Sequence, residues 1–330
     1  MNIGVVGAGG WGTALANVAA ANGHNVRMWS RSAQLVEEIN NSHTNSTYLD
    51  GVTIHESIAA GTDPQLLHGS DIMLVSVPTQ FIRTVLETYD FRIRESLIAN
   101  ASKGIENKTL LRVSQLLKDV AKIDRDNYAV LTGPSHAEEV IRGVPTTILA
   151  ASSDEHTAVT IQSVFSNATM RVYRSNDVIG AELGGALKNV IAIAAGIIDG
   201  LGTGDNTKAA LITRGLAEIT RLGVVLGANP ATFSGLSGLG DLIVTCDSRH
   251  SRNRHVGEAI GRGKSLKDIL AESPMIAEGV ATTESAYELA QRHGVEMPIV
   301  EQVYQILFFN KSPRLAIHEL MTRESKSEVQ

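Results

Sequence analysis

A lysine and an asparagine interrupt an apolar stretch in the second half of the chain. Lys188 and Asn189 lie within residues 178–201, which otherwise consist largely of Ala, Gly, Ile, Leu and Val. Lysine is rarely buried unless it is paired, and burial lowers its pKa from about 10.4, which permits proton exchange near neutral pH. Lys188 is therefore a candidate acid or base. The alternative is a side chain that extends to the surface and packs only its stem.

Two glycines lie one turn before this lysine. Gly184 and Gly185 each weaken a helix by roughly 1 kcal/mol relative to alanine. Their presence therefore indicates that another backbone or a ligand approaches the helix closely at this point. Ordinary packing between helices is the simpler explanation of the same residues.

Two further charged residues are placed where ligands bind. Lys103 follows a strand expected at residues 97–101. The carboxyl ends of parallel strands border the crevice where ligands bind, so Lys103 is a candidate binding residue and not only a surface lysine. Asp241 follows a glycine turn and precedes an apolar run. It either caps a helix or holds a cation such as Lys188 in place.

Two segments have the composition of anion-binding sites. Ser251, Arg252 and Asn253 open a helix after a polar loop, and such a helix N-terminus suits a phosphate. A solvated basic turn is the alternative. Gly133 and Ser135 follow another expected strand. Backbone N–H groups there can face an anion, and Ser135 can cap the next helix.

The opening of the chain has the pattern of a dinucleotide-binding turn. An apolar strand is expected at residues 3–6, followed by Gly7, Gly9 and Gly12 and then by a helix over 13–21. In this arrangement the glycines allow the tight turn, the approach of a pyrophosphate and close helix packing. The unpaired N–H groups of the helix start face the phosphates. The strand and helix around the glycines are the context that the motif requires.

The end of the second expected strand, residues 25–31, bears on the choice of cofactor. An NAD-specific site carries an acid there, which binds the ribose 2′-OH. This chain has none, and Arg31 stands where it can face a 2′-phosphate, although a solvated arginine fits as well. We therefore expect NADPH to be accepted and preferred. Tyr48, in a polar loop, is expected to cover the cofactor, and Glu278, in a loop after Ile276, either touches the cofactor or caps a turn.

The order of elements predicts two domains. Expected strands alternate with helices as far as residue 173, which is typical of a parallel, doubly wound sheet. Helical patterns rich in Ala, Gly and Leu follow. We therefore expect a dinucleotide-binding domain over 1–177 and a helical substrate domain over 178–330. The further strands are expected at 71–78, 128–132, 146–150 and 171–173, and the helices at 34–41, 79–88, 109–122, 178–201, 207–226, 253–261, 266–271, 281–293 and 299–308.

Composition narrows the class of protein. The 330 residues exceed what one core usually serves, and 43% of them are hydrophobic, so a globular protein of two domains is expected. The net charge of −6 argues against nucleic-acid binding. The single cysteine, Cys246, lies in a strand-like apolar run and suits a reducing compartment. The histidines lack metal-site spacing, so no metal is expected. We see no signal peptide and no stretch that could span a membrane, so the cytoplasm is the expected location.

Taken together, these segments resemble NAD(P)-dependent glycerol-3-phosphate dehydrogenase of the bacterial type, over nearly the whole chain. The resemblance implies reversible reduction of dihydroxyacetone phosphate to sn-glycerol 3-phosphate for phospholipid synthesis. It also implies a Rossmann-type sheet domain, an all-α C-terminal domain like that of 6-phosphogluconate dehydrogenase, and, by analogy, a homodimer. The motifs that carry it are Gly7-Ala8-Gly9-Gly10-Trp11-Gly12-Thr13-Ala14-Leu15, Ala101-Ser102-Lys103-Gly104, Gly133-Pro134-Ser135, Leu183-Gly184-Gly185-Ala186-Leu187-Lys188-Asn189, Gly238-Leu239-Gly240-Asp241-Leu242, Ser251-Arg252-Asn253-Arg254 and Glu278-Gly279.

The resemblance also assigns residues to roles. Lys188 is implied as the proton donor and acceptor. The substrate is implied to contact Lys103, Gly133, Ser135, Lys188, Asn189, Asp241, Ser251, Arg252 and Asn253. The cofactor, NADP or NAD, is implied to contact Gly7, Gly9, Gly10, Trp11, Gly12, Arg31, Tyr48, Lys103, Ala137, Arg252, Ile276 and Glu278. Gly10 is a departure, because many relatives carry serine there.

These roles predict that two ammonium groups, from Lys103 and Lys188, meet beside the carbonyl that is reduced. Cations aimed at the oxygen stabilise the negative charge that grows there. Lys103 is expected to lower the pKa of Lys188, and Asp241 to raise it. A 3-hydroxyacid dehydrogenase of the same architecture is the alternative enzyme. A regulatory protein that senses NADPH without turnover is the alternative outside catalysis.

Overall fold

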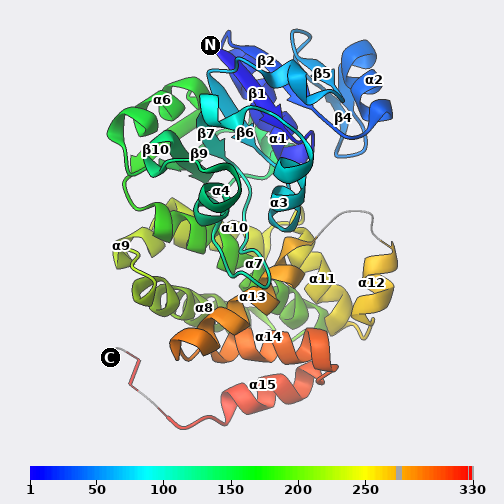
Figure 1. Ribbon diagram of the computed structural model, residues 1–330. Helices are drawn as coiled ribbons and strands as arrows, with labels where there is room; N and C mark the ends of the chain where they lie inside the picture. Colours follow the sequence, from blue (N-terminus) through cyan, green and yellow to red (C-terminus); the bar gives the residue numbers. More distant parts are fainter. Residues whose placement is uncertain (273–276, 326, 329–330) are drawn as a thin grey trace.

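The computed structural model describes residues 1–272, 277–325 and 327–328. Its first half, blue to green in Figure 1, is built around one sheet with helices beside it. The strands of this half are β1 (Asn2–Val6), β2 (Asn25–Trp29), β3 (Thr44–Asn45), β4 (Leu49–Thr53), β5 (Ala59–Gly61), β6 (Ile72–Val75), β7 (Leu97–Asn100), β8 (Tyr128–Thr132), β9 (Thr146–Ala151) and β10 (Met170–Ser175). The α-helices of this half are α1 (Gly10–Ala21), α2 (Ala33–Ser42), α3 (Thr79–Thr88), α4 (Val113–Ala121), α5 (Ala137–Val140) and α6 (Glu155–Phe165).

The large sheet has eight strands in the order β10-β9-β8-β7-β6-β1-β2-β5. All neighbours are parallel except β8 and β9, which are antiparallel. The expectation of a parallel sheet is confirmed except at this pair. The connection explains this exception: a parallel return usually runs through a full helix, and residues 133–145 contain only the four-residue α5.

Helices cover both faces of the sheet, as the doubly wound arrangement requires. One core joins the inner faces of α1 and α6 to the strands, through residues such as Leu15 and Ile161. A second core on the opposite face joins α3 and α4, through residues such as Ile82 and Leu116. These two cores hold β1, β6 and β7 in place. The segments that follow the three strands therefore begin at fixed positions.

Some elements of the first half differ from the sequence-based expectation. The loop around Tyr48 is a small hairpin of β3 and β4, and α6 and β5 were not expected. Helix α4 begins at Val113 rather than at residue 109, because Lys108 and Leu110 have positive φ angles of 69° and 59°, which no α-helix allows. By contrast, α3 and β8 have the expected bounds.

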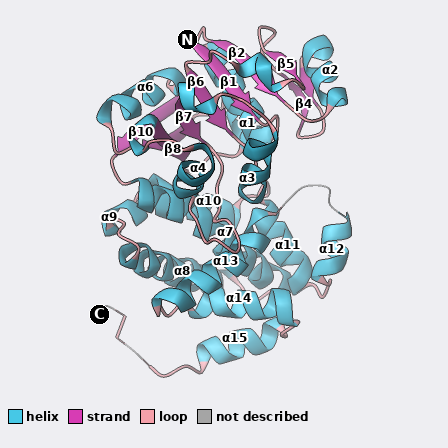
Figure 2. Ribbon diagram, viewed as in Figure 1, coloured by secondary structure: helices cyan, strands magenta, loops and turns pink. Residues whose placement is uncertain are grey.

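The second half consists of helices packed around α7 (Val178–Leu201). Figure 2 shows this half in cyan below the magenta strands. Its other helices are α8 (Asp205–Val225), α9 (Pro230–Phe233), the π-helix η4 (Leu236–Gly240), α10 (Asp241–Asp247), α11 (Arg252–Gly261), α12 (Leu266–Glu272), α13 (Glu278–His293), α14 (Pro298–Phe309) and α15 (Pro313–Met321).

Helix α7 is the core of this half. It is long and apolar enough to cross a membrane, which the sequence analysis had not expected of any stretch. The apolar window is wholly buried inside the protein, so its composition is explained by packing. Glycines bring α11 very close to it: a Cβ at Gly257 would lie 1.9 Å from the carbonyl oxygen of Ile193, and one at Gly196 would lie 2.0 Å from that of Arg254. The start of α11 is thereby held against α7.

Two segments of the second half were misread from the sequence. Cys246 lies in α10, a helix, and not in a strand-like run; it is fully buried. Glu278 is the first residue of α13 and not part of a loop. Ile276 lies outside the described residues. Helix α15 was not expected, whereas α7 has the expected bounds.

Candidate active site

Two lysines from distant parts of the chain bind one buried aspartate. Lys188 projects from α7, Lys103 follows β7, and Asp241 is the first residue of α10. The Nζ of Lys188 donates to Oδ1 of Asp241, and the Nζ of Lys103 donates to Oδ2 at 2.6 Å. The Asp241 side chain is 1% exposed. Asp241 was predicted either to cap a helix or to hold a cation, and its carboxylate holds two cations.

The charges of this cluster control its protonation. Burial lowers the pKa of Lys188 to about 8, although Asp241 raises it; Lys103 lowers it further. Burial would raise the pKa of Asp241, but Lys103 and Lys188 outweigh that effect and lower it below its ordinary value. Asp241 is therefore ionised near neutral pH, and Lys188 is within reach of losing its proton there.

Thr245 completes the environment of the Lys188 ammonium group. Its Oγ1 accepts from Lys188 Nζ at 2.7 Å and donates to the carbonyl of Asp241 at 2.6 Å. This residue was not predicted, because the apolar run that contains Cys246 was taken to be strand-like. The four-residue spacing from Asp241 to Thr245, which places both on one face of a helix, was the available signal.

The lysines border a cavity that also contains the start of α11. Ser251 caps this helix by accepting from the N–H of Arg254 at 3.2 Å. Asn253 accepts from the N–H of Gly279 at 2.9 Å, which ties α11 to the start of α13. The cavity is lined by Lys103, Ser135, His136, Lys188, Asn189, Asp241, Val244, Thr245, His250, Ser251, Arg252, Asn253 and Glu278. All the residues predicted for the substrate lie there except Gly133.

Gly133 lies beside the cavity lining and shapes it through its backbone. Its φ angle of 134° is one that side chains rarely adopt. Its carbonyl accepts from Lys103 Nζ at 3.2 Å and from Ser135 Oγ at 2.9 Å. The prediction that Ser135 caps the next helix was wrong, because α5 begins only at Ala137 and its N-cap position is His136.

His136 is a cavity residue that the sequence analysis did not single out. Burial lowers its pKa, and the neighbouring Lys188 lowers it further. Its Nε2 is buried without a hydrogen-bond partner among the residues described. Its ring lies 5.8 Å from that of His250. No spacing rule would have linked His136 to Lys188 or to His250, so sequence alone offered no signal for it.

The glycine-rich turn fits a dinucleotide. Gly7 has a φ angle of 107°, and a Cβ at Gly12 would lie 2.4 Å from the carbonyl oxygen of Gly7, so neither position tolerates a side chain. Helix α1 begins at Gly10, earlier than residue 13. The N-cap residue of this helix, Gly9, has no side chain that could cap it, and its first turn contains no acidic residue. Its N–H groups are therefore available to a pyrophosphate.

Residues predicted to touch the cofactor gather around this turn. A Cβ at Gly10 would lie 3.6 Å from the backbone oxygen of Tyr48 and 3.7 Å from the Cβ of Ala137, so the serine of many relatives would fit there. The Nε1 of Trp11 is buried and has no partner in the described part of the chain. Arg31 is exposed directly after β2 and forms no ion pair with any described residue.

Glu278 links the second half to the first. The backbone N–H of Thr79, the first residue of α3, lies near its carboxylate. Burial raises the pKa of Glu278, although Arg252 and this N–H act to lower it. Glu278 therefore lies between the cavity with the lysines and the sheet domain, and its contact with the cofactor stays a prediction.

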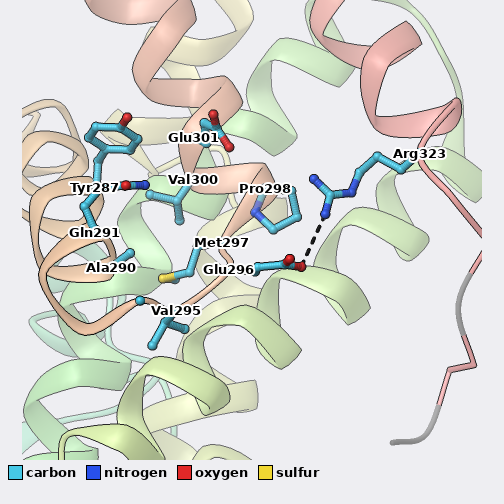
Figure 3. A pocket seen from close by; sticks show the side chains of 11 residues that line it. Tyr287, Ala290, Gln291, Val295, Glu296, Met297, Pro298, Val300, Glu301 and Arg323 are labelled. Carbon is cyan, nitrogen blue, oxygen red and sulfur yellow. Dashed lines mark hydrogen bonds and ion pairs between the residues drawn. The ribbon is translucent and has the colours of Figure 1, made fainter.

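Another pocket lies away from the lysines, between the end of α13 and the start of α14. Figure 3 shows Tyr287, Met297 and Pro298 around it, and Glu296 joined to Arg323 by an ion pair of 3.4 Å. None of the described residues that are predicted to contact substrate or cofactor lines it. The candidate site is therefore the cavity between the two halves and not this pocket.

Comparison with known proteins agrees with the geometry. Two family models match: the N-terminal part of NAD-dependent glycerol-3-phosphate dehydrogenase over residues 2–158 and its C-terminal part over 177–318. The glycerol-3-phosphate dehydrogenase [NAD(P)+] of Syntrophotalea carbinolica is 51% identical, over all of both chains. That of Geobacillus thermodenitrificans is 52% identical, over 99% of this chain and 96% of its own.

A solved structure has the same architecture. The crystal structure of glycerol-3-phosphate dehydrogenase from Coxiella burnetii superimposes with a TM-score of 0.91 at 37% identity, covering 98% of this chain and 99% of its own. The superposition includes both halves, so the two structures share the arrangement of the sheet half relative to the helical half. With two family models that together span most of its length, the chain belongs to the NAD-dependent glycerol-3-phosphate dehydrogenase family.

Proposed function

We propose that the protein reduces dihydroxyacetone phosphate to sn-glycerol 3-phosphate, reversibly, with NADPH or NADH. The observation that carries this proposal is the pair of ammonium groups on one buried carboxylate, facing a cavity whose wall includes the start of α11. The reaction adds a hydride to the carbonyl carbon and a proton to its oxygen. The protein must therefore hold the ketone, stabilise the charge on oxygen and deliver the proton.

Lys188 is the proton donor in this proposal. Asp241 and Thr245 each accept from its ammonium group, so the position of Nζ is fixed and one N–H remains for the substrate oxygen. A pKa of about 8 lets Lys188 give up the proton near neutral pH and take it back in the reverse reaction. Lys103 adds a second positive charge beside the same oxygen. When bound, NADPH supplies the hydride.

The start of α11 holds the phosphate in this proposal. Ser251, Arg252 and Asn253 combine backbone N–H groups, a guanidinium and an amide at a helix N-terminus, a combination that suits a phosphate. Because the phosphate does not react, its binding energy is available to orient the ketone. Asn189, Gly133 and Ser135 line or shape the remaining wall.

The cofactor is proposed to lie along the glycine-rich turn. Gly7, Gly9 and Gly12 let the pyrophosphate approach the start of α1, where Gly10 and Trp11 contact it. The NADPH preference rests on Arg31, which is exposed where an NAD-specific site would carry an acid. The remaining cofactor contacts in the proposal are Tyr48, Lys103, Ala137, Arg252, Ile276 and Glu278.

We also propose domain boundaries, an oligomeric state and a location for the protein. Residues 1–177 form the dinucleotide-binding domain and residues 178–330 the substrate domain, because β10 ends at Ser175 and α7 begins at Val178. The protein is proposed to be a cytoplasmic homodimer. Light scattering of the purified protein tests the dimer: a mass of one chain across the micromolar range would refute it.

The decisive assay follows NADPH oxidation with dihydroxyacetone phosphate. Turnover is expected with this ketone, and far less with dihydroxyacetone, which lacks the phosphate. The reverse assay offers NADP with sn-glycerol 3-phosphate or a 3-hydroxy acid. Oxidation of the 3-hydroxy acid alone would favour the alternative dehydrogenase, and NADPH binding without turnover of any ketone would favour a sensor.

A further inference from the structure

A second buried acid joins the two halves of the molecule, away from the lysines. Glu182 lies near the start of α7 and is 6% exposed. Its carboxylate accepts hydrogen bonds from three residues of the first half: Arg112 Nη1 at 2.5 Å, Tyr128 Oη at 2.6 Å, and both the backbone N–H and the Oγ of Ser114 at 2.7 Å. The four bonds and the guanidinium charge leave this carboxylate fully paired.

One partner of Glu182 belongs to a strand that also positions Lys103. Ser114 lies in the first turn of α4, and Tyr128 is the first residue of β8. At its other end β8 leads into Gly133, whose carbonyl binds Lys103 Nζ. Thr132, the last residue of β8, lies against Gly185 of α7, where a Cβ would come within 2.8 Å of its Oγ1. Helix α7 therefore meets β8 at Glu182 and again at Gly185.

Lys188 follows Glu182 on the same rigid helix. Six residues correspond to about 9 Å along a helix axis, so a shift or rotation of α7 at Glu182 is transmitted to Lys188. The Lys188 ammonium group must reach Asp241 Oδ1 while Lys103 holds Oδ2. Because Lys103 belongs to the sheet domain and Lys188 to α7, their meeting depends on how α7 is seated on the sheet.

We propose that Glu182 is a positioning residue: by binding Arg112, Ser114 and Tyr128 it fixes the seating of α7, and thereby the place of the Lys188 ammonium group beside Lys103. This inference rests on the proposed reduction of dihydroxyacetone phosphate. Glu182 touches neither substrate nor cofactor and acts only through α7. Replacement by glutamine turns one carboxylate oxygen, an acceptor, into an NH₂ group, a donor. This NH₂ group would face the donors of Arg112, Ser114 or Tyr128.

The test compares three variants with the wild type. Glu182→Gln disturbs the whole anchor, and Tyr128→Phe removes one of its hydrogen bonds. Glu218→Gln is the matched control: Glu218 is 2% exposed and accepts from the N–H groups of Ile299 and Val300, entirely within the helical half. NADPH binding counts the folded sites, and a single turnover with saturating dihydroxyacetone phosphate then gives the rate of hydride transfer per site, across pH.

We expect Glu182→Gln to slow hydride transfer per site by about tenfold, within the roughly hundredfold that a misplacement of 1 Å can cost. Its NADPH Kd should not change, and the pH midpoint of the rate should move, because the pKa of Lys188 depends on its distance from Asp241 and Lys103. Tyr128→Phe should change the rate in the same direction by a smaller factor. Glu218→Gln should leave rate and midpoint unchanged.

A purely structural role would give a different result. The number of NADPH-binding sites would fall, while the rate per site and its pH midpoint would stay at the wild-type values in both Glu182→Gln and Tyr128→Phe. That result, or failure of both variants to fold, would overturn the inference. If the wild type itself does not turn over dihydroxyacetone phosphate, the proposed function fails instead.

Discussion

Two ionic clusters join the halves of the molecule, and they differ in how completely their charges are matched. In the first, Lys103 and Lys188 share the single carboxylate of Asp241, which leaves one positive charge in excess when both lysines are protonated. In the second, Glu182 has one cation, Arg112, and every described contact of its carboxylate is with a donor. The first cluster borders a cavity, whereas the second is closed by the protein itself.

The difference separates the tasks of chemistry and of support. A cluster with an excess cation beside a cavity favours a negative charge that forms there, such as that on a carbonyl oxygen accepting hydride. In a matched cluster, every donor and acceptor is already paired within the protein. Such a cluster therefore stabilises the packing of its elements and does not bind a ligand. We therefore expect changes in the first to reduce turnover at constant stability. Changes in the second should reduce stability and, through the seating of α7, the rate of hydride transfer per site.

The largest effect is expected when the excess charge is removed. Lys188→Ala should lower kcat by about 10²–10⁴-fold, the usual contribution of a general acid, with NADPH binding nearly intact. Lys208→Ala is the control, because this lysine pairs with Asp199 and Asp247 in the same half. Steady-state rates and a fluorescence titration of NADPH are the measurements. Turnover like that of the wild type would refute the assignment of Lys188.

Breaking the matched cluster tests the other side of the comparison. Arg112→Ala leaves the Glu182 carboxylate buried without its cation, which should lower the free energy of unfolding by about 3 kcal/mol. Arg174→Ala removes an exposed pair with Glu155 and should cost less than about 1 kcal/mol. Denaturant unfolding of both variants measures the difference. Equal losses would show that the Glu182 cluster contributes no more than a surface pair.

Loss of the phosphate site should be seen first in substrate binding. Arg252→Ala should raise KM for dihydroxyacetone phosphate by about 10- to 100-fold, the range expected for hydrogen bonds to a charged group. The effect on dihydroxyacetone should be small. Arg262→Ala is the control, because Arg262 is the exposed C-cap residue of the same helix and pairs with Glu258. If Arg252→Ala raises KM by the same factor for both ketones, the Arg252 side chain does not bind the phosphate.

A smaller effect is expected at Arg31. It lies outside both clusters, and its proposed partner is a phosphate on the cofactor. Arg31→Ala should reduce the preference for NADPH over NADH by about tenfold, through loss of one charge-assisted contact. Ratios of kcat/KM for the two cofactors measure it. Comparable efficiencies with both cofactors in the wild type, unchanged in the variant, would remove Arg31 from the cofactor site.

The sequence predicted elements best where local pattern and tertiary packing agree. Helix α7 and strand β8 have the expected bounds, because their apolar runs match their burial. Helix α10 was misread, because Leu242, Ile243 and Val244 form an apolar run that suits a strand, and packing against α7 outweighs that preference. The antiparallel β9 follows a connection with only one short helix, α5, and the periodicity of the sequence does not reveal the direction of that strand.

The candidate site could be predicted residue by residue but not contact by contact. Lys188 stood out because a charge interrupts an apolar helix. Its bond to Asp241 spans 53 positions and that of Lys103 spans 138, so no local spacing indicates them. Glu182 interrupts the same apolar helix, but its partners lie 54 to 70 positions away, so the sequence did not indicate them. One sequence shows which residues are unusual, and the fold decides which of them meet.

The pH dependence of both directions of the reaction tests the account most directly. Burial and Lys103 lower the pKa of Lys188 to about 8, against the pull of Asp241. Reduction needs the protonated lysine, so kcat/KM for dihydroxyacetone phosphate should fall above about pH 8. Oxidation needs the neutral lysine, so kcat/KM for sn-glycerol 3-phosphate should fall below the same pH. A shared midpoint near 8 is the predicted result, and a midpoint near the 10.4 of an ordinary lysine would contradict it.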